Sequence, residues 1–309
     1  MRAFVFPGQG AQTIGMGKAL AEAYPVAQAV FEEVDDALGE TLSALIWDGD
    51  IETLTLTENA QPALMATSIA ALRALEAEGL GLDTAAYVAG HSLGEYSALC
   101  AAGALKLDDT ARLLRRRGLA MQAAVPVGEG AMAAVLGLDL AAVTTLAADA
   151  AEGEVCVAAN DNDPAQVVIS GHAGAVGRAV DMAKGRGAKR ALPLPVSAPF
   201  HSPLMAPAAE EMAEALASVE ISAPKVPLVA NVRASEVSDP AEIRRLLVEQ
   251  VTHSVRWRES VMWMADAGVT DIWEIGAGKA LCGMVRRIAK DVATRAVGTP
   301  DDVAAAVAG

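Results

Sequence analysis

The clearest candidate for chemistry in this sequence is Ser92, which lies between two glycines in the stretch GHSLG, residues 90–94. The stretch matches G-x-S-x-G, a pattern in which a strand turns sharply into a helix and exposes the serine oxygen. AAYVA before it is typical of a buried strand, and LGEYSALCAAGAL after it is typical of a helix. This context favours a nucleophilic Ser92, and an ordinary glycine-rich turn is the alternative.

A nucleophilic serine needs a base, and the chain has four histidines: His91, His172, His201 and His253. His91 directly precedes Ser92, so on a strand-like approach its side chain points away from the serine. His172 lies in a predicted turn, SGHAG. His201 lies in the proline-rich loop PVSAPFHSPLM, which faces a predicted cleft between two bodies. The position of the loop favours His201 as the base, with His253 as a rival.

A run of three arginines, residues 115–117, falls in a predicted helix from residue 108 to about residue 124. Helical spacing puts Arg117 on the apolar face with Leu113, Leu114 and Met121. A buried guanidinium needs an anionic partner. A substrate carboxylate and a structural ion pair both satisfy that need, and the sequence alone leaves the two open.

Two glycine-rich stretches do not fit nucleotide-binding motifs. FPGQGAQTIGMG lacks the G-x-G-x-x-G spacing, and EIGAGKAL lacks the upstream glycine and the Ser or Thr of a P-loop. We therefore expect neither dinucleotide binding nor nucleotide hydrolysis.

The composition excludes several classes of function. A formal charge of -15 and an aromatic content of 4% argue against nucleic-acid binding, which uses basic faces and stacking rings. We predict no membrane-spanning segment, because charged residues interrupt the most apolar stretch, residues 131–151. The three cysteines are far apart and flanked by apolar residues, which indicates reduced thiols and a cytoplasmic protein.

Hydrophobic periodicity predicts two bodies of α/β type. Buried strands are expected at residues 2–6, 85–89, 226–231 and 270–276, and a helix at residues 61–79. Residues 128–196 follow a βαββαβ order, which is typical of ferredoxin-like domains. We therefore predict a large subdomain with a mainly parallel sheet from residues 1–127 and 197–309, and a small inserted subdomain from residues 128–196.

Taken together, several stretches resemble the malonyl-CoA:acyl-carrier-protein transacylases of fatty-acid synthesis. They are FPGQGAQ, QPAL, GHSLGEYSAL, MQAAVP, GAMAAVLGL, QVVISG, ALPLPVSAPFHSPLM and EIGAGKAL. The resemblance covers almost the whole chain in order and spacing. It implies an α/β-hydrolase-like large subdomain with a ferredoxin-like insert.

The resemblance also implies roles for particular residues. Ser92 attacks the malonyl thioester, His201 acts as its base, and Arg117 holds the free malonyl carboxylate. The backbone N–H groups of Gln9 and Leu93 form the oxyanion hole.

Further matches concern the surroundings of these groups. Gln250 matches the position whose main-chain carbonyl orients the histidine. Asn160 and Asn231 match polar positions near the cleft, with ordinary loop and strand-end hydrogen bonding as the alternative. Leu93 and Phe200 resemble malonyl-selective members of the family.

The implied mechanism is ping-pong: malonyl-CoA acylates the serine, and the phosphopantetheine thiol of a holo acyl carrier protein takes the malonyl group. It requires no metal or redox cofactor, and we expect a monomer. The alternatives are a trans-acting polyketide malonyltransferase, a serine thioesterase or esterase, and a scaffold without turnover.

Because carrier proteins are acidic, docking on this acidic chain requires local basic patches. The available clusters are Arg115 with Arg116, the run Lys184, Arg186, Lys189 and Arg190, and Arg286 with Arg287. A solvated face is the alternative for each cluster.

Overall fold

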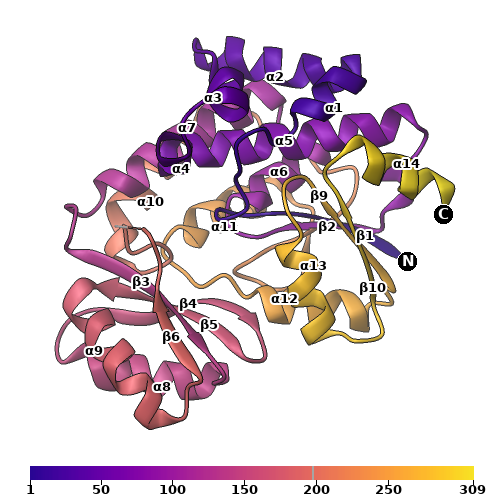
Figure 1. Ribbon diagram of the computed structural model, residues 1–309. Coiled ribbons are helices and arrows are strands. Elements are labelled where there is room, and N and C mark those ends of the chain that lie inside the picture. Colours follow the sequence, from indigo (N-terminus) through magenta and orange to yellow (C-terminus); the bar gives the residue numbers. More distant parts are fainter. Residues whose placement is uncertain (197) are drawn as a thin grey trace.

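The computed structural model describes residues 1–196 and 198–309 and shows an α/β fold with two separate sheets (Figure 1). The strands of the larger sheet, in spatial order, are β10 (Ala293–Val297), β9 (Asp271–Ile275), β1 (Arg2–Phe6), β2 (Tyr87–Gly90), β7 (Leu228–Val229) and β8 (Glu236–Val237). These strands run parallel except for the pair β7 and β8. The mainly parallel sheet predicted from the sequence is confirmed, with one antiparallel strand at its edge.

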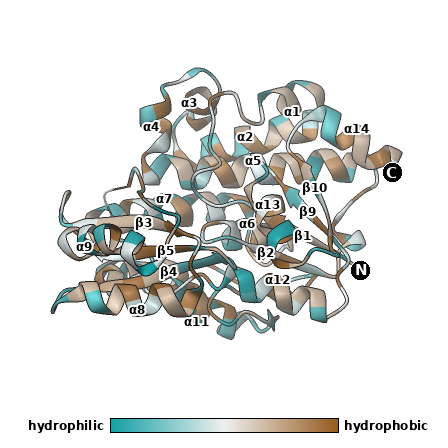
Figure 2. Cartoon of the chain, turned by 60° about the horizontal axis from the view of Figure 1, so that its bottom comes forward, coloured by the Kyte–Doolittle hydropathy of each residue, from teal (hydrophilic) through white to brown (hydrophobic). Residues whose placement is uncertain are grey.

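The smaller sheet consists of antiparallel strands in the order β4 (Cys156–Asp163), β5 (Gln166–His172), β3 (Gly130–Leu136) and β6 (Arg190–Pro193). Two helices, α8 (Leu140–Ala151) and α9 (Ala173–Ala183), cover one face of this sheet (Figure 1). Apolar and polar segments alternate along both helices (Figure 2), as expected for helices that are half exposed. Their apolar faces enclose a small core of their own that includes Val135, Leu146 and Ile169.

The remaining helices belong to the larger body. They are α1 (Lys18–Ala23), α2 (Pro25–Leu38), α3 (Leu42–Asp48), α4 (Ile51–Thr55), α5 (Thr57–Ala77), α6 (Gly94–Ala101), α7 (Leu107–Ala123), α10 (Ala206–Ala217), α11 (Pro240–Gln250), α12 (Trp257–Asp266), α13 (Ala280–Ile288) and α14 (Pro300–Ala308). Short 3-10 turns lie at Leu82–Thr84 and Pro203–Met205 in the larger body and at Lys184–Arg186, directly after α9, in the smaller one. No helix within the described residues has the length and apolar character needed to cross a membrane.

Several predicted elements have different bounds in the structure. The strand expected at residues 226–231 is only two residues long in β7, because the chain turns at Ala230 and returns as β8. The helix expected from Gln61 begins earlier, so Pro62 lies in the first turns of α5. His172 was expected in a turn and is instead the last residue of β5. Ser197, where we placed the return to the large subdomain, lies outside the described residues.

Strands β1 and β2 bring their carboxyl ends together, because Phe6 pairs with Gly90 in parallel register. The loop after β1 and the turn after β2 therefore lie side by side, and the N–H of His91 donates to the carbonyl of Phe6 at 3.1 Å. In open parallel sheets, ligands bind outside the carboxyl ends of the strands.

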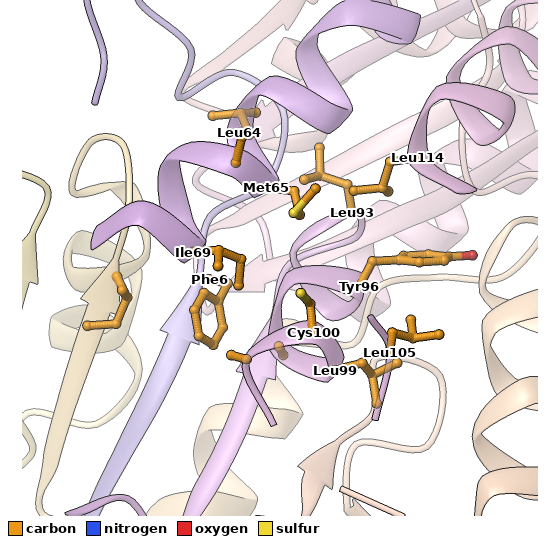
Figure 3. Packing of buried hydrophobic residues seen from close by; sticks show 14 of the residues in the cluster. Phe6, Leu64, Met65, Ile69, Leu93, Tyr96, Leu99, Cys100, Leu105 and Leu114 are labelled. Atoms are coloured by element: carbon orange, nitrogen blue, oxygen red, sulfur yellow. The ribbon is translucent and has the colours of Figure 1, made fainter. Parts of the chain in front are cut away.

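Helix α6 follows this turn and is buried along its whole length. Figure 3 shows Leu93, Tyr96 and Leu99 packed among Met65 of α5, Leu114 of α7 and their neighbours. A helix enclosed in this way is anchored against movement, so the residues at its N-terminus are held in place.

Candidate active site

Ser92 lies at the sharp turn between β2 and α6 and has a backbone φ of 54°, in the left-handed region. The glycines around it are required by close contacts. A Cβ at Gly90 would lie 1.9 Å from the backbone of Gly94, and a Cβ at Gly94 would lie 2.2 Å from the carbonyl oxygen of Phe6. The G-x-S-x-G stretch therefore forms a tight strand–turn–helix elbow, which is the context predicted for it.

The turn is held by the side chain of Asn231. Its Oδ1 accepts from the N–H of Ser92 at 2.8 Å, and its Nδ2 donates to the carbonyl of Gly90 at 2.6 Å. Asn231 is fully buried, so these bonds are shielded from water. The structure thus places Asn231 behind the elbow, where it maintains the backbone conformation of Ser92.

His201 lies beside the serine, with its Nε2 at 2.8 Å from Ser92 Oγ. Its Nδ1 is 2.8 Å from the main-chain carbonyl of Gln250, which fixes a proton on Nδ1 and leaves Nε2 free to accept. Burial, with a further contribution from the charge of Arg117, lowers the pKa of His201 to about 3. The imidazole is therefore neutral near pH 7, as a general base must be.

The other histidines lie elsewhere. His253 is exposed, and its Nδ1 is 2.9 Å from the carbonyl of Glu249. His172 accepts from the N–H of Val155 through Nδ1 in the smaller sheet. His91 is near Ser92 in sequence, but its Nε2 is 2.8 Å from Asn162 Oδ1, and burial lowers its pKa. Of the four, the structure brings His201 into contact with Ser92.

Arg117 projects from α7 into the same site and is 1% exposed, as its helical phase predicted. Its Nη1 donates to Gln61 Oε1 at 2.7 Å, while its Nη2 donates to Gln250 Oε1 at 2.9 Å and to Ser92 Oγ at 3.2 Å. All three acceptors are neutral. Burial lowers the pKa of this guanidinium, because the charge is poorly solvated. An anionic ligand group would compensate it.

These side chains surround a cavity of about 340 Å³ between the two sheets. The larger body contributes Gln9, Ser92, Leu93, Arg117, Phe200 and His201 to its lining. Strands β3, β4 and β5 of the smaller body contribute Met132, Asn160 and Val168 among others. Asn160 is 6% exposed and lines the cavity from β4. Every site residue predicted from the sequence except Asn231 and Gln250 lines this cavity, and those two support it from behind.

The loop after β1 reaches the elbow because of its glycines. A Cβ at Gly8 would lie 2.7 Å from the carbonyl oxygen of His91, so only glycine allows this approach. Gln9 follows directly and lines the same cavity as Leu93, which immediately precedes α6. Backbone N–H groups at a helix N-terminus and in a neighbouring loop can together bind a developing oxyanion.

Sequence reasoning missed two buried residues of the site. Gln61 binds Arg117, and its presence in the QPAL motif was the only signal for it. Glu95 is 1% exposed and accepts from Gln250 Nε2 at 2.6 Å. Burial raises the pKa of Glu95 to about 7, although its hydrogen bonds to Gln250 and Asn231 oppose that rise. No spacing rule distinguishes such a carboxyl group from a solvated glutamate in the first turn of a helix.

The chain matches the model of the acyl transferase domain family over residues 3–299, and it belongs to this family. It is 48% identical over 306 residues to the malonyl CoA-acyl carrier protein transacylase of Bacillus subtilis, which covers 99% of this chain and 96% of the relative.

The chain is also similar to solved structures of malonyltransferases. The acyl-carrier-protein-S-malonyltransferase of Bartonella henselae has a TM-score of 0.97 and 57% identity and covers 99% of this chain and 98% of its own. A malonyl-transacylase in complex with a type II PKS acyl-carrier protein has a TM-score of 0.96 and 42% identity, and covers 99% of both chains.

Proposed function

We propose that this protein transfers the malonyl group from malonyl-CoA to the phosphopantetheine thiol of a holo acyl carrier protein and thereby supplies fatty-acid synthesis. The observation that carries the proposal is the position of Ser92 Oγ, which lies 2.8 Å from His201 Nε2 and 3.2 Å from Arg117 Nη2. A nucleophile, a base and a carboxylate-binding cation thus converge on one atom. The similarity to the malonyltransferases described above supports the malonyl group as the substrate.

In the first half-reaction, Ser92 Oγ attacks the thioester carbonyl and His201 Nε2 accepts the hydroxyl proton. The negative charge on the carbonyl oxygen is stabilised by the N–H groups of Gln9 and Leu93. The C–S bond then breaks, the proton passes from His201 to the departing CoA sulfur, and the malonyl ester of Ser92 remains.

In the second half-reaction, His201 accepts the proton of the carrier's thiol and the sulfur attacks the ester carbonyl. The C–O bond breaks, Ser92 recovers its proton, and the malonyl group leaves on the carrier. Together, the two half-reactions exchange the CoA thioester for the carrier thioester through an ester of Ser92. The proposed reaction therefore uses no metal or cofactor. Throughout, Arg117 pairs with the malonyl carboxylate, which holds the carbonyl at the oxyanion site.

Leu93 and Phe200 are proposed to set acyl selectivity. Both line the cavity and are 1% and 8% exposed, so an α-methyl branch on the acyl group would meet well-packed side chains. A single methyl group is worth about 1–3 kcal/mol in such a pocket.

The remaining proposals concern organisation. We divide the chain into a large subdomain (residues 1–127 and 197–309) and a small ferredoxin-like subdomain (residues 128–196), which the separate core of the smaller body supports. We propose a monomer, because Ser92, His201 and Arg117 already converge within one chain. The three cysteines are free and buried, which supports a reducing, cytoplasmic location.

A second candidate is the same transfer to a carrier protein of polyketide synthesis. The similarity to a malonyl-transacylase in complex with a type II PKS acyl-carrier protein favours it. A thioesterase is less well supported, because simple esters need no buried guanidinium such as Arg117.

Initial-rate kinetics with malonyl-CoA and holo carrier protein test the proposal. Parallel lines in double-reciprocal plots are expected, because the malonyl-serine ester separates the two substrates in time. Intersecting lines would require both substrates to be bound together. Release of free malonate without transfer would indicate a hydrolase. Carrier proteins from fatty-acid and polyketide pathways, compared by kcat/KM, decide between the two candidates.

A further inference from the structure

Glu95 is the second residue of α6 and lies one turn beyond Ser92, whose carbonyl accepts from the N–H of Glu95 at 3.0 Å. Its side chain is 1% exposed. A buried carboxyl group is costly unless its hydrogen bonds are made, so its partners show what the residue does in the fold.

One oxygen of Glu95 receives two hydrogen bonds from residues that hold the site. Oε2 accepts from Gln250 Nε2 at 2.6 Å and from the N–H of Asn231 at 3.3 Å. Asn231 in turn binds the backbone of Ser92 through its side chain. Glu95 therefore binds both supports of the site, Asn231 and Gln250, which also bond to each other through Gln250 Nε2 and Asn231 Oδ1 at 3.3 Å.

Gln250 contacts Ser92, His201 and Arg117, the three residues assigned to the proposed reaction. Its Oε1 accepts from Arg117 Nη2 at 2.9 Å, its Nε2 donates to the carbonyl of Ser92 at 3.0 Å, and its main-chain carbonyl lies 2.8 Å from His201 Nδ1. The side-chain amide has one acceptor and one donor end. If it rotated by half a turn, its NH₂ group would face the guanidinium of Arg117, where donor would meet donor.

We propose that Glu95 is a positioning residue for the acyl carboxylate: it fixes the amide of Gln250 so that Oε1 faces Arg117 and the guanidinium is directed into the cleft. The inference rests on the proposed function, because it assigns Arg117 to the malonyl carboxylate. Without an acceptor at position 95, Gln250 Nε2 loses its shortest hydrogen bond and keeps only those to the carbonyl of Ser92 at 3.0 Å and to Asn231 Oδ1 at 3.3 Å. The amide whose oxygen accepts from Arg117 is then held less firmly.

The test measures ligand binding in a Ser92→Ala background, where no acyl transfer occurs. Calorimetry compares malonyl-CoA with acetyl-CoA, which differ in the free carboxylate. Adding Glu95→Ala should weaken malonyl-CoA binding about tenfold and leave acetyl-CoA binding unchanged. Adding Glu95→Gln should restore malonyl-CoA binding, because the glutamine carbonyl can accept the same two hydrogen bonds. A general loss of folded protein lowers the binding stoichiometry and does not change the ratio of the two dissociation constants.

Asp163→Ala is the matched control, because Asp163 is also 1% exposed but pairs with Arg287 at 2.7 Å. It should leave the ratio unchanged. The inference would be overturned if Glu95→Ala weakened the binding of malonyl-CoA and acetyl-CoA equally, or weakened neither. It would also be overturned if Glu95→Gln did not restore malonyl-CoA binding. The proposed function fails separately if the Ser92→Ala protein with Glu95 intact does not prefer malonyl-CoA over acetyl-CoA.

Discussion

Ser92 and His201 meet at 2.8 Å between Oγ and Nε2, and both have a positive backbone φ, 54° and 56°. Left-handed backbone at a residue other than glycine costs about 1–2 kcal/mol. Asn231 binds the backbone N–H of Ser92 and so maintains this conformation there, while the carbonyl of Gln250 fixes the ring of His201. The left-handed backbone at Ser92 and His201 thus lowers the free energy of unfolding, and these are the two residues whose contact the proposed chemistry needs.

This strain predicts an order of stability among variants of Ser92. Ser92→Gly should be more stable than Ser92→Ala by about 1 kcal/mol, because glycine adopts a positive φ without a Cβ clash. Both should lack transferase activity. Thermal denaturation measures the difference, and equal melting temperatures would show that the turn is not strained.

Arg117→Ala should reduce kcat/KM for malonyl-CoA about a hundredfold, because the carboxylate loses a charged hydrogen-bonding partner inside the cleft. Arg117→Lys should recover little, since a single ammonium cannot replace the planar fork that binds Gln61 and Gln250 and is proposed to bind the substrate carboxylate. Arg116→Ala is the control, because Arg116 lies next along the helix and pairs with Glu211. Similar losses in Arg116→Ala and Arg117→Ala would contradict the role given to Arg117.

The lowered pKa of His201, about 3, predicts the pH dependence of the proposed acylation. A base must be neutral, so a lowered pKa extends activity toward acid. The rate of malonyl-enzyme formation should stay flat from about pH 8 down to about pH 5. In Arg117→Ala the acid limb should move to higher pH, because a positive charge that opposes protonation is gone. Stopped-flow acylation measures both profiles, and a half-maximal rate near pH 6.5 in the wild type would show an unperturbed histidine.

The glycines of the elbow should tolerate no Cβ. Gly94→Ala is expected to destabilise the protein by several kcal/mol, because its Cβ would lie 2.2 Å from the carbonyl oxygen of Phe6 in the buried sheet. Gly177→Ala in α9 has no atom within 4 Å of the added Cβ and should stabilise by about 0.5–1 kcal/mol. Denaturant titration compares the two. A neutral Gly94→Ala would mean that β1 and the elbow separate more easily than the packing indicates.

Carrier docking should depend on the smaller body. Arg115, Arg116 and Arg287 are engaged by Glu40, Glu211 and Asp163, whereas Lys184, Lys189 and Arg190 are exposed. Reversing the charge of Lys189 and Arg190 together should raise KM for the carrier severalfold and leave KM for malonyl-CoA unchanged. Lys290→Glu changes an exposed charge on the larger body and serves as the control. An unchanged KM for the carrier in the double variant would remove this cluster from the docking surface.

The features that could be predicted from the sequence are those that a local residue pattern encodes. The elbow around Ser92 and the burial of Arg117 follow from short-range spacing, and both are present in the structure. Glu95 and Gln61 have roles only through partners far along the chain, 155 and 56 residues away, and no periodicity encodes such contacts. The two-residue length of β7 likewise reflects an early return of the chain that an apolar run does not indicate.

The most direct test of the central claim is intact-mass spectrometry after brief incubation with malonyl-CoA. The wild-type protein should gain the mass of one malonyl group, the Ser92→Ala variant should gain none, and holo acyl carrier protein should remove the adduct. A wild-type protein that stays unmodified while malonyl-CoA remains intact would contradict the account.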